Sequence, residues 1–333
     1  VMKTIILTCL LFALSLFIYA QNSQLQNLDI NLSNVDYPYE VHFLKVQMQN
    51  HNLQMAYMDV RSPTPNLKNI VLLHGKNFNG AYWETTIRQL VSNGYRVIVP
   101  DQIGFGKSSK PFHIQYSFQQ LALNTKALLD SLGIRKTAVL GHSMGGMLAT
   151  RFALMFPDIT EKLILENPIG LEDYKLMVPY TSIDDLYKDE LSQNYDKIKQ
   201  YQLTSYYDNQ WKPEYEQWVD LLAGWTLNED YPVIAWNAAL TADMIFTQPV
   251  VYEFPNIKCP TLLIIGTRDR TAIGKALATL EMQKTMGLYN KLGKKTHDKI
   301  PNSKLVELDN VGHLPHIEAF DRFIKPLVEF LNK

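Results

Sequence analysis

Two stretches of strand character lie between residues 39 and 60, separated by a polar tripeptide. YEVHFLKVQMQ (39–49) and LQMAYMDV (53–60) flank Asn50-His51-Asn52. Short runs rich in strand-forming residues and bounded by turn residues are typical of paired strands. The pattern therefore predicts a β-hairpin at the entry to the fold.

From residue 69 onward, short apolar runs alternate with segments of helical length. Such runs, bounded by turn signals, are typical of strands buried on both faces of a parallel sheet. The candidate strands are NIVLLHG (69–75), YRVIVPD (95–101), TAVLGHS (137–143), EKLILEN (161–167), PTLLIIG (260–266) and SKLVELD (303–309).

The segments between these runs carry apolar residues at spacings of three and four. They lie near 82–93, 118–132, 144–156 and 318–331. This spacing is expected of helices that pack one face on a sheet. The alternation predicts an α/β fold: a doubly wound, mostly parallel sheet, with core segments 37–170 and 251–333.

The interval 171–250 has no clear strand and is unusually aromatic. It contains four of the five tryptophans and nine tyrosines. Rings with an apolar body and a polar tip suit the wall of a ligand pocket, so we predict a helical cap that closes over one end of the sheet. For any single ring, packing inside the cap's own small core is the simpler interpretation.

The N-terminus differs in composition from the rest of the chain. Lys3 precedes an uncharged apolar stretch from Thr4 to Tyr19, which ends at Ala20. This pattern predicts a signal peptide over residues 1–20, then a polar spacer over 21–36, and hence export to the periplasm or medium. An uncleaved anchor is the alternative. After leader removal Cys259 alone remains, so no intrachain disulfide is expected.

Composition narrows the possible partners. The 333 residues are 46% hydrophobic and 20% charged, with a formal net charge of −1, which argues against a nucleic-acid partner. After leader removal no stable membrane insertion is expected, and the sequence does not indicate an oligomeric state. The lysine-rich segment 284–300 is interpreted as a solvated loop.

The strongest chemical motif is Gly141-His142-Ser143-Met144-Gly145. It fits G-x-S-x-G, with an apolar strand before it and a helical pattern after it. A serine at such a sharp strand-to-helix turn has an exposed hydroxyl, and neighbouring glycines make room for the turn. We predict that Ser143 is a nucleophile; a plain Gly-Ser turn is the alternative.

A serine nucleophile requires a histidine base and an acid that orients it. Asp269 follows the run that ends at residue 266, and His313 lies just beyond the last strand, giving the order Ser, Asp, His. His316 competes with His313 but falls at the start of the closing helix. Asp309 competes with Asp269 but resembles a turn former.

The loop after the first parallel run is expected to complete the site. We predict that the backbone N–H groups of Lys76 and Met144 form the oxyanion hole, while His74 is a structural histidine. The residues expected to line the substrate pocket are Asn77, Phe78, His142, Trp211 and Trp225.

Together these motifs resemble the α/β-hydrolase family, particularly its lidded members. The resemblance runs from about residue 40 to the C-terminus through HGKNFNGAYW, DQIGFGKSS, GHSMGG, GTRD and GHLPH. It implies a Ser143–His313–Asp269 triad. The serine argues against dehalogenases and epoxide hydrolases, which use aspartate there. Proline iminopeptidases carry Gly-Gly-Pro-Gly where this chain has Gly75-Lys76-Asn77-Phe78.

The leading functional hypothesis is therefore an exported serine hydrolase that cleaves a small to medium, partly apolar carboxylic ester through an acyl-enzyme. No metal or organic cofactor is expected. Aminopeptidase, thioesterase and carbon–carbon bond hydrolase activities would use the same triad. A ligand receptor without catalytic activity on the same scaffold is a further alternative.

Overall fold

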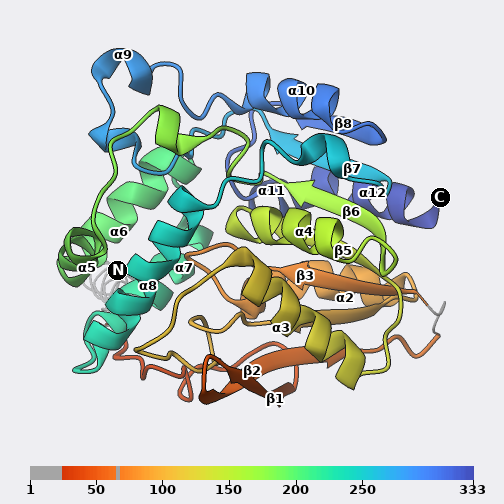
Figure 1. Cartoon of the computed structure of the whole chain (residues 1–333), viewed down its shortest axis with the longest axis horizontal. Coiled ribbons are helices and arrows are strands. Elements are labelled where there is room, and N and C mark those ends of the chain that lie inside the picture. The colour runs from red at the N-terminus through yellow and green to blue at the C-terminus, as the bar shows by residue number, and fades with distance from the viewer. Residues whose placement is uncertain (1–24, 65–67) are drawn as a thin grey trace, which may run out of the picture.

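The computed structural model describes residues 25–64 and 68–333, which form one eight-stranded sheet flanked by helices (Figure 1). The strand order is β1-β2-β4-β3-β5-β6-β7-β8. β1 pairs with β2, and β2 with β4, in antiparallel fashion, whereas all later pairs are parallel. The predicted α/β class and mostly parallel sheet are confirmed.

The entry hairpin forms with a tighter turn than the sequence suggested. β1 (Val41–Met48) and β2 (His51–Val60) are joined by Gln49 and Asn50, with φ angles of 48° and 66°. Two successive residues with positive φ are typical of the two-residue turn that matches the twist of paired strands. His51, expected in the turn, is therefore the first residue of β2 and pairs with Met48.

Six parallel strands occupy the six predicted runs. Their bounds are β3 (Asn69–Leu73), β4 (Arg96–Pro100), β5 (Thr137–His142), β6 (Thr160–Glu166), β7 (Thr261–Gly266) and β8 (Ser303–Leu308). Every residue of β5 and β7 is buried, which explains why these runs are apolar without alternation. The chain reverses its direction of progress across the sheet at β3, and ligands of such sheets bind beyond the carboxyl ends of the strands near that point.

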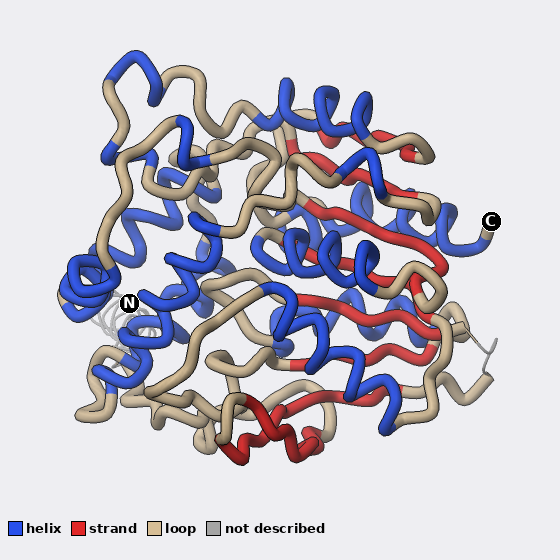
Figure 2. Tube along the Cα trace, in the orientation of Figure 1, coloured by secondary structure: helices blue, strands red, loops and turns tan. Residues whose placement is uncertain are grey.

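Helices cover both faces of the sheet (Figure 2). α3 (Phe118–Ser131) and α4 (Met144–Met155) pack on one face, together with α10 (Tyr289–Lys299). A short 3₁₀ turn η1 (Gly80–Trp83) leads into α2 (Glu84–Ser92), which packs on the other face with α12 (Phe320–Asn332). Residues of β3 alternate between the two cores, so one strand supplies both layers.

The lysine-rich segment 284–300 is mainly a helix, and its prediction as a loop was wrong. Tyr289, Leu292 and Thr296 of α10 are buried against β7 and β8, whereas Lys291, Lys294, Lys295 and Lys299 are exposed. The exposed lysines dominate the composition. The buried positions nevertheless recur at helical spacing, and this weak apolar stripe was the overlooked signal.

Between β6 and β7 the described chain is helical and has no strand. Figure 1 shows the helices α5 to α8 gathered beyond one end of the sheet. In chain order they are η2 (Tyr174–Leu176), α5 (Ile183–Leu191), α6 (Tyr195–Tyr201), the π-helical turn η3 (Gln202–Tyr206), η4 (Pro213–Tyr215), α7 (Glu216–Trp225), α8 (Tyr231–Thr247) and η5 (Phe254–Asn256). We call residues 171–250 the cap. After β7, η6 (Lys275–Leu277) and α9 (Leu280–Gln283) precede α10, and α11 (Pro315–Glu318) precedes α12.

Residues 25–36 do more than space the fold from its N-terminus. Leu28 and Leu32 are buried in a cluster with Trp225 and Ile234 of the cap. The Leu28 N–H donates to Gly224 O at 3.1 Å, and Trp225 Nε1 donates to Asp29 O at 3.0 Å. This segment is therefore an integral part of the cap packing.

The predicted signal peptide over residues 1–20 lies outside the described residues. Within residues 25–64 and 68–333, no helix combines the length and apolar character needed to cross a bilayer.

Candidate active site

Ser143 occupies the turn between β5 and α4 with φ 57° and ψ −122°. A positive φ is uncommon for serine, so the surroundings must hold this strained conformation. The neighbouring glycines permit it: a Cβ on Gly141 would lie 2.0 Å from Gly145 O, and one on Gly145 would lie 2.1 Å from Leu73 O. The motif glycines are therefore required for the chain to turn here.

Asp269 and His313 meet at the carboxyl ends of β7 and β8. His313 Nδ1 donates to Asp269 Oδ2 at 2.6 Å, and neither side chain is exposed to solvent. A short charge-assisted contact of this kind fixes both the tautomer and the plane of the imidazole. His313 Nε2 is also buried and has no hydrogen-bond partner among the described residues, which leaves it free to accept a proton.

Asn167 supports the same carboxylate and was not predicted from the sequence. Its Nδ2 donates to Asp269 Oδ2 at 2.7 Å, and its Oδ1 accepts from the Gly266 N–H at 2.8 Å. Asn167 directly follows β6 with φ 35°, a conformation that asparagine tolerates better than most residues. A polar residue at the end of the strand beside β7 was the available signal.

His142 joins the serine turn to the histidine loop. Its Nε2 donates to His313 O at 2.8 Å, and its Nδ1 accepts from Tyr82 Oη at 3.0 Å. Burial, and then the proximity of His313 and His316, lower the pKa of His142 well below its usual value, so the ring is neutral. This neutral bridge places the Ser143 turn beside the His313 loop.

The loop that follows β3 lies against the serine. A Cβ on Gly75 would stand 3.1 Å from Ser143 Cβ, a tight contact, so glycine here favours the close approach of the two backbones. The Phe78 N–H donates to Gly75 O at 3.2 Å, which closes a turn over Lys76 and Asn77. The turn does not use the Lys76 N–H. Met144 begins α4, where first-turn N–H groups have no partner within the helix.

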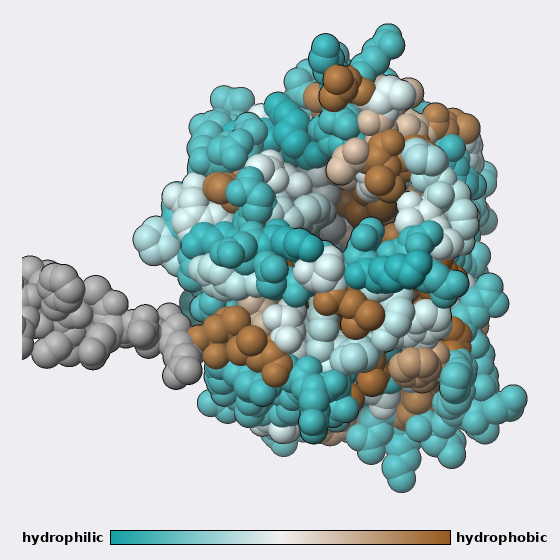
Figure 3. All heavy atoms as spheres, turned by 90° about the vertical axis from the view of Figure 1, so that its left-hand side faces the viewer, coloured by the Kyte–Doolittle hydropathy of each residue, from teal (hydrophilic) through white to brown (hydrophobic). Residues whose placement is uncertain are grey.

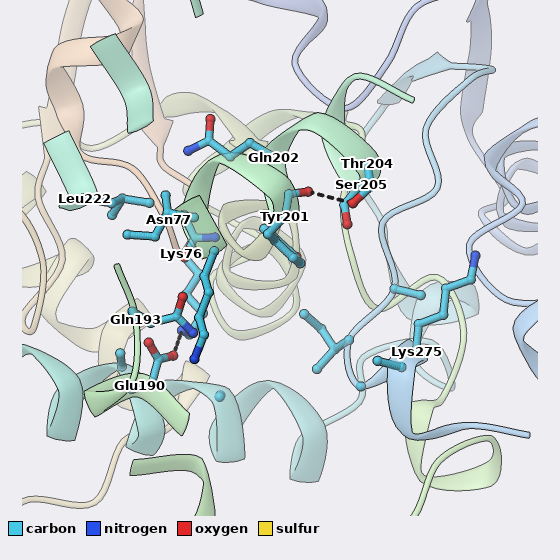
Figure 4. A pocket seen from close by; sticks show the side chains of 18 of the residues that line it. Lys76, Asn77, Glu190, Gln193, Tyr201, Gln202, Thr204, Ser205, Leu222 and Lys275 are labelled. Atoms are coloured by element: carbon cyan, nitrogen blue, oxygen red, sulfur yellow. Dashed lines mark hydrogen bonds and ion pairs between the residues drawn. The ribbon is translucent and has the colours of Figure 1, made fainter. Parts of the chain in front are cut away.

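A cavity of about 720 Å³ lies between this loop and the cap. Figure 3 looks onto the cap end of the molecule and shows the surface hollowed there. Lys76 and Asn77 contribute to its wall from the core, and the cap contributes apolar side chains, among them Ile198, Leu222, Trp225 and Ile234. Lys76 Nζ pairs with Glu190 Oε1 of α5 at 2.9 Å, and Figure 4 shows this contact spanning one side of the cavity.

Comparison with known proteins identifies the fold family. The family model described as alpha/beta hydrolase fold matches residues 68–320. The chain belongs to the α/β-hydrolase family. A crystal structure of a probable hydrolytic enzyme from Pseudomonas aeruginosa PAO1 is 50% identical, with a TM-score of 0.92, over 93% of this chain and all of that one.

Relatives whose names state an activity are more distant. A 2-hydroxy-6-oxo-6-phenylhexa-2,4-dienoate hydrolase of Comamonas testosteroni is 27% identical over 271 residues, which is 79% of this chain and 87% of that protein. Lipase 1 of Psychrobacter immobilis is 25% identical over 259 residues, covering 76% and 73% respectively. By family and relatives, this α/β-hydrolase is a hydrolytic enzyme.

The five predicted pocket residues separate into two groups in this α/β-hydrolase. Asn77 and Trp225 line the cavity. The other three are absent from its wall: Phe78 stacks on Tyr82, His142 is wholly buried, and Trp211 packs edge-on against Tyr207. The orientation of these three rings depends on packing between distant segments, which the sequence does not reveal.

The competing candidates have other contacts. His316 Nδ1 and its backbone N–H both donate to Glu166 Oε1 at 2.8 Å, and its ring stacks on Trp83, so it packs beneath the site. His74 Nδ1 donates to Gly75 O, and its Nε2 accepts from the Gln102 N–H, as expected of a structural histidine. Asp309 is exposed and accepts from Thr267 Oγ1.

The residues that the structure describes contain no group of three or more His, Cys, Asp or Glu side chains suited to hold a metal ion. Cys259 is buried, and desolvation raises the pKa of its thiol to about 11, so this thiol is neutral at pH 7.

Proposed function

We propose that this α/β-hydrolase is an exported serine hydrolase that cleaves small to medium, partly apolar carboxylic esters through an acyl-enzyme. The observation that carries the proposal is the 2.6 Å contact between buried Asp269 and His313. His142, next to Ser143, is hydrogen-bonded to the backbone of His313 and so connects the two parts of the site. A histidine oriented by a buried carboxylate beside a strained serine is the arrangement that activates a hydroxyl nucleophile.

The reaction proceeds in two balanced halves. His313 Nε2 takes the Ser143 hydroxyl proton as Oγ bonds to the ester carbonyl carbon, and the backbone N–H groups of Lys76 and Met144 hold the developing oxyanion. The bond to the leaving oxygen then breaks, and His313 gives its proton to the departing alcohol. Water repeats the sequence on the acyl-enzyme, which releases the carboxylic acid and restores Ser143.

The cavity argues for a partly apolar substrate. Of the described cap residues that line it, eight are aliphatic or aromatic and six are polar, while the core side carries Lys76 and Asn77 on the loop that follows β3. Sites of this kind bind an apolar body and orient it through a few polar groups. We infer that the acyl or alkyl portion of the ester occupies the cap side and that the scissile carbonyl approaches the Lys76 loop.

Active-site labelling tests the nucleophile. A fluorophosphonate probe should modify the wild-type protein, and the modified peptide should contain Ser143. The Ser143→Ala variant should neither label nor turn over p-nitrophenyl butyrate. Equal labelling of that variant at another serine would overturn the assignment, and stoichiometric ester binding without turnover in the wild type would favour a receptor.

A carbon–carbon bond hydrolase is the second candidate. The Comamonas testosteroni relative, which is similar over 79% of this chain, is named as a dienoate hydrolase. The same triad would serve. Parallel assays of simple aryl esters and a 2-hydroxy-6-oxodienoate separate the two, since a preference of more than about 100-fold in kcat/KM identifies the better transition-state fit.

Export is tested on the protein recovered from cells that produce it. N-terminal sequencing of protein from the periplasm or medium should begin near Gln21. Recovery of a membrane-bound product that still carries Met2 would contradict cleavage of the leader.

A further inference from the structure

Tyr206 brings the cap into direct contact with His313. Its ring stacks on the imidazole with 4.7 Å between centroids and 20° between planes. Its carbonyl oxygen accepts from the His313 N–H at 2.9 Å. Tyr206 is buried and ends the π-helical turn η3, and π-turns inside helical segments are frequent at functional sites.

The close approach of the Tyr206 backbone to the His313 loop requires a glycine at position 312. A Cβ on Gly312 would lie 2.1 Å from Tyr206 O, a backbone atom that cannot move aside. The glycine before His313 therefore allows the cap to reach the base.

The Tyr206 hydroxyl is held from the side of the cavity. It accepts from Asn77 Nδ2 at 2.8 Å, and it is also hydrogen-bonded to Tyr201, whose ring meets that of Tyr206 edge-on. Asn77 and Tyr201 both line the cavity, and both side chains are seen in its wall in Figure 4. The Tyr206 hydroxyl is thus held by Asn77 of the loop that follows β3 and by Tyr201 of the cap, and the face of the Tyr206 ring lies against His313.

The other neighbours of the imidazole do not share this geometry. Asp269 contacts the ring edge at Nδ1, neutral His142 is tilted by 55° at 4.8 Å, and Tyr289 lies edge-on at 6.5 Å. Among the ring contacts that His313 makes within residues 25–64 and 68–333, only that with Tyr206 is stacked. Aromatic faces attract cations, and His313 becomes a cation whenever it holds the Ser143 proton.

We propose that Tyr206 is a positioning residue of the cap: its ring fixes the plane of His313 and stabilises the imidazolium that forms in each half of the reaction. The inference rests on the proposed serine-hydrolase function. It makes the cap part of the acid–base machinery, in addition to its role as a wall of the substrate cavity.

Graded fluorination tests the ring electrostatics without changing its shape. Tyr206→Phe should keep kcat within about threefold of wild type, because the ring face remains. Phenylalanine analogues carrying one, two and three fluorines at position 206 should lower kcat stepwise, to about 10-fold in total, with KM within about twofold. A kcat that is independent of fluorine number would overturn the electrostatic role.

Truncation variants test the same point more coarsely. Tyr206→Leu should lower kcat about 10- to 30-fold and leave KM within about threefold. The matched control is Tyr207→Leu, which removes an equally buried neighbouring ring that stacks on Tyr215, and it should keep kcat. Equal losses of kcat in both variants would show a structural role only, and the fluorinated series decides if Tyr206→Leu does not fold.

The two levels of inference fail in different ways. If the fluorophosphonate does not label Ser143 in the wild type, the serine-hydrolase proposal is overturned, and the inference about Tyr206 with it. If the wild type is labelled at Ser143 but kcat does not change with the number of fluorines at position 206, only the inference about Tyr206 is overturned.

Discussion

The strand-end triad and the cap cavity are built on different principles. Ser143, Asp269 and His313 follow β5, β7 and β8 within five residues of each strand end, so a rigid hydrogen-bonded sheet places them. The cavity wall is assembled from cap helices, the Lys76 loop and the segment 270–276, which are held together by side-chain packing and by side-chain contacts such as that from Asn77 to Tyr206. A sheet register fixes position far more tightly than the packing of short helices does.

This difference determines what each region can change. A shift of about 1 Å at the triad disrupts proton transfer, so its residues are held by buried hydrogen bonds such as that from Asn167 to Asp269. The cap can vary its apolar wall with little effect on the chemistry. We therefore expect substitutions in the strand-end site to act on kcat, and substitutions in the cavity wall to act mainly on selectivity.

The two histidines that competed for the role of base give the largest expected contrast. His313→Ala should lower kcat by on the order of 10⁴- to 10⁶-fold, because no other group would accept the serine proton. His316→Ala should instead destabilise the fold by about 3 to 5 kcal/mol, since it removes the ring that pairs with buried Glu166 and leaves this side chain the backbone N–H of residue 316 as a donor.

Steady-state kinetics and thermal unfolding of both variants separate these effects. Retained turnover in folded His316→Ala is expected. Comparable losses of kcat in the two variants would contradict the assignment of His313 as the base from its contact with Asp269.

The sequence predicted the strand-end region well because its signals are local. The apolar runs marked all six parallel strands, and G-x-S-x-G marked the tightest turn. It did not reveal Asn167, whose partner Asp269 is 102 residues away, nor α10, whose buried face is masked by lysines. It also could not orient Phe78 and Trp211, because those orientations depend on rings contributed by other segments.

The Lys76 loop is where the two regions meet, and it gives an effect of intermediate size. Lys76 occupies the second position of the turn closed by Phe78 N–H and Gly75 O, a position that proline favours. Lys76→Pro removes the backbone N–H, whereas Lys76→Ala removes only the side chain and its pairing with Glu190.

If the backbone donor serves the oxyanion, Lys76→Pro should turn over about 10²- to 10³-fold more slowly than Lys76→Ala. The comparison between the two variants cancels the loss of the ammonium group. Equal kcat values, with circular dichroism showing both proteins folded, would remove Lys76 from the oxyanion hole.

The cavity wall gives the smallest effect and the sharpest test of the division between the two regions. Leu222 of α7 lines the cavity, so Leu222→Ala should enlarge it. We expect the ratio of kcat/KM for a bulky acyl ester to that for a small one to shift by about 10-fold, because a methylene in an apolar site is worth about 1 to 3 kcal/mol. Leu227→Ala makes the same chemical change at a half-exposed cap position off the cavity and should leave the ratio unchanged. A chain-length series of p-nitrophenyl esters measures both. If Leu222→Ala lowered kcat equally for every ester, the wall would be coupled to the triad, and the separation of chemistry from selectivity would fail.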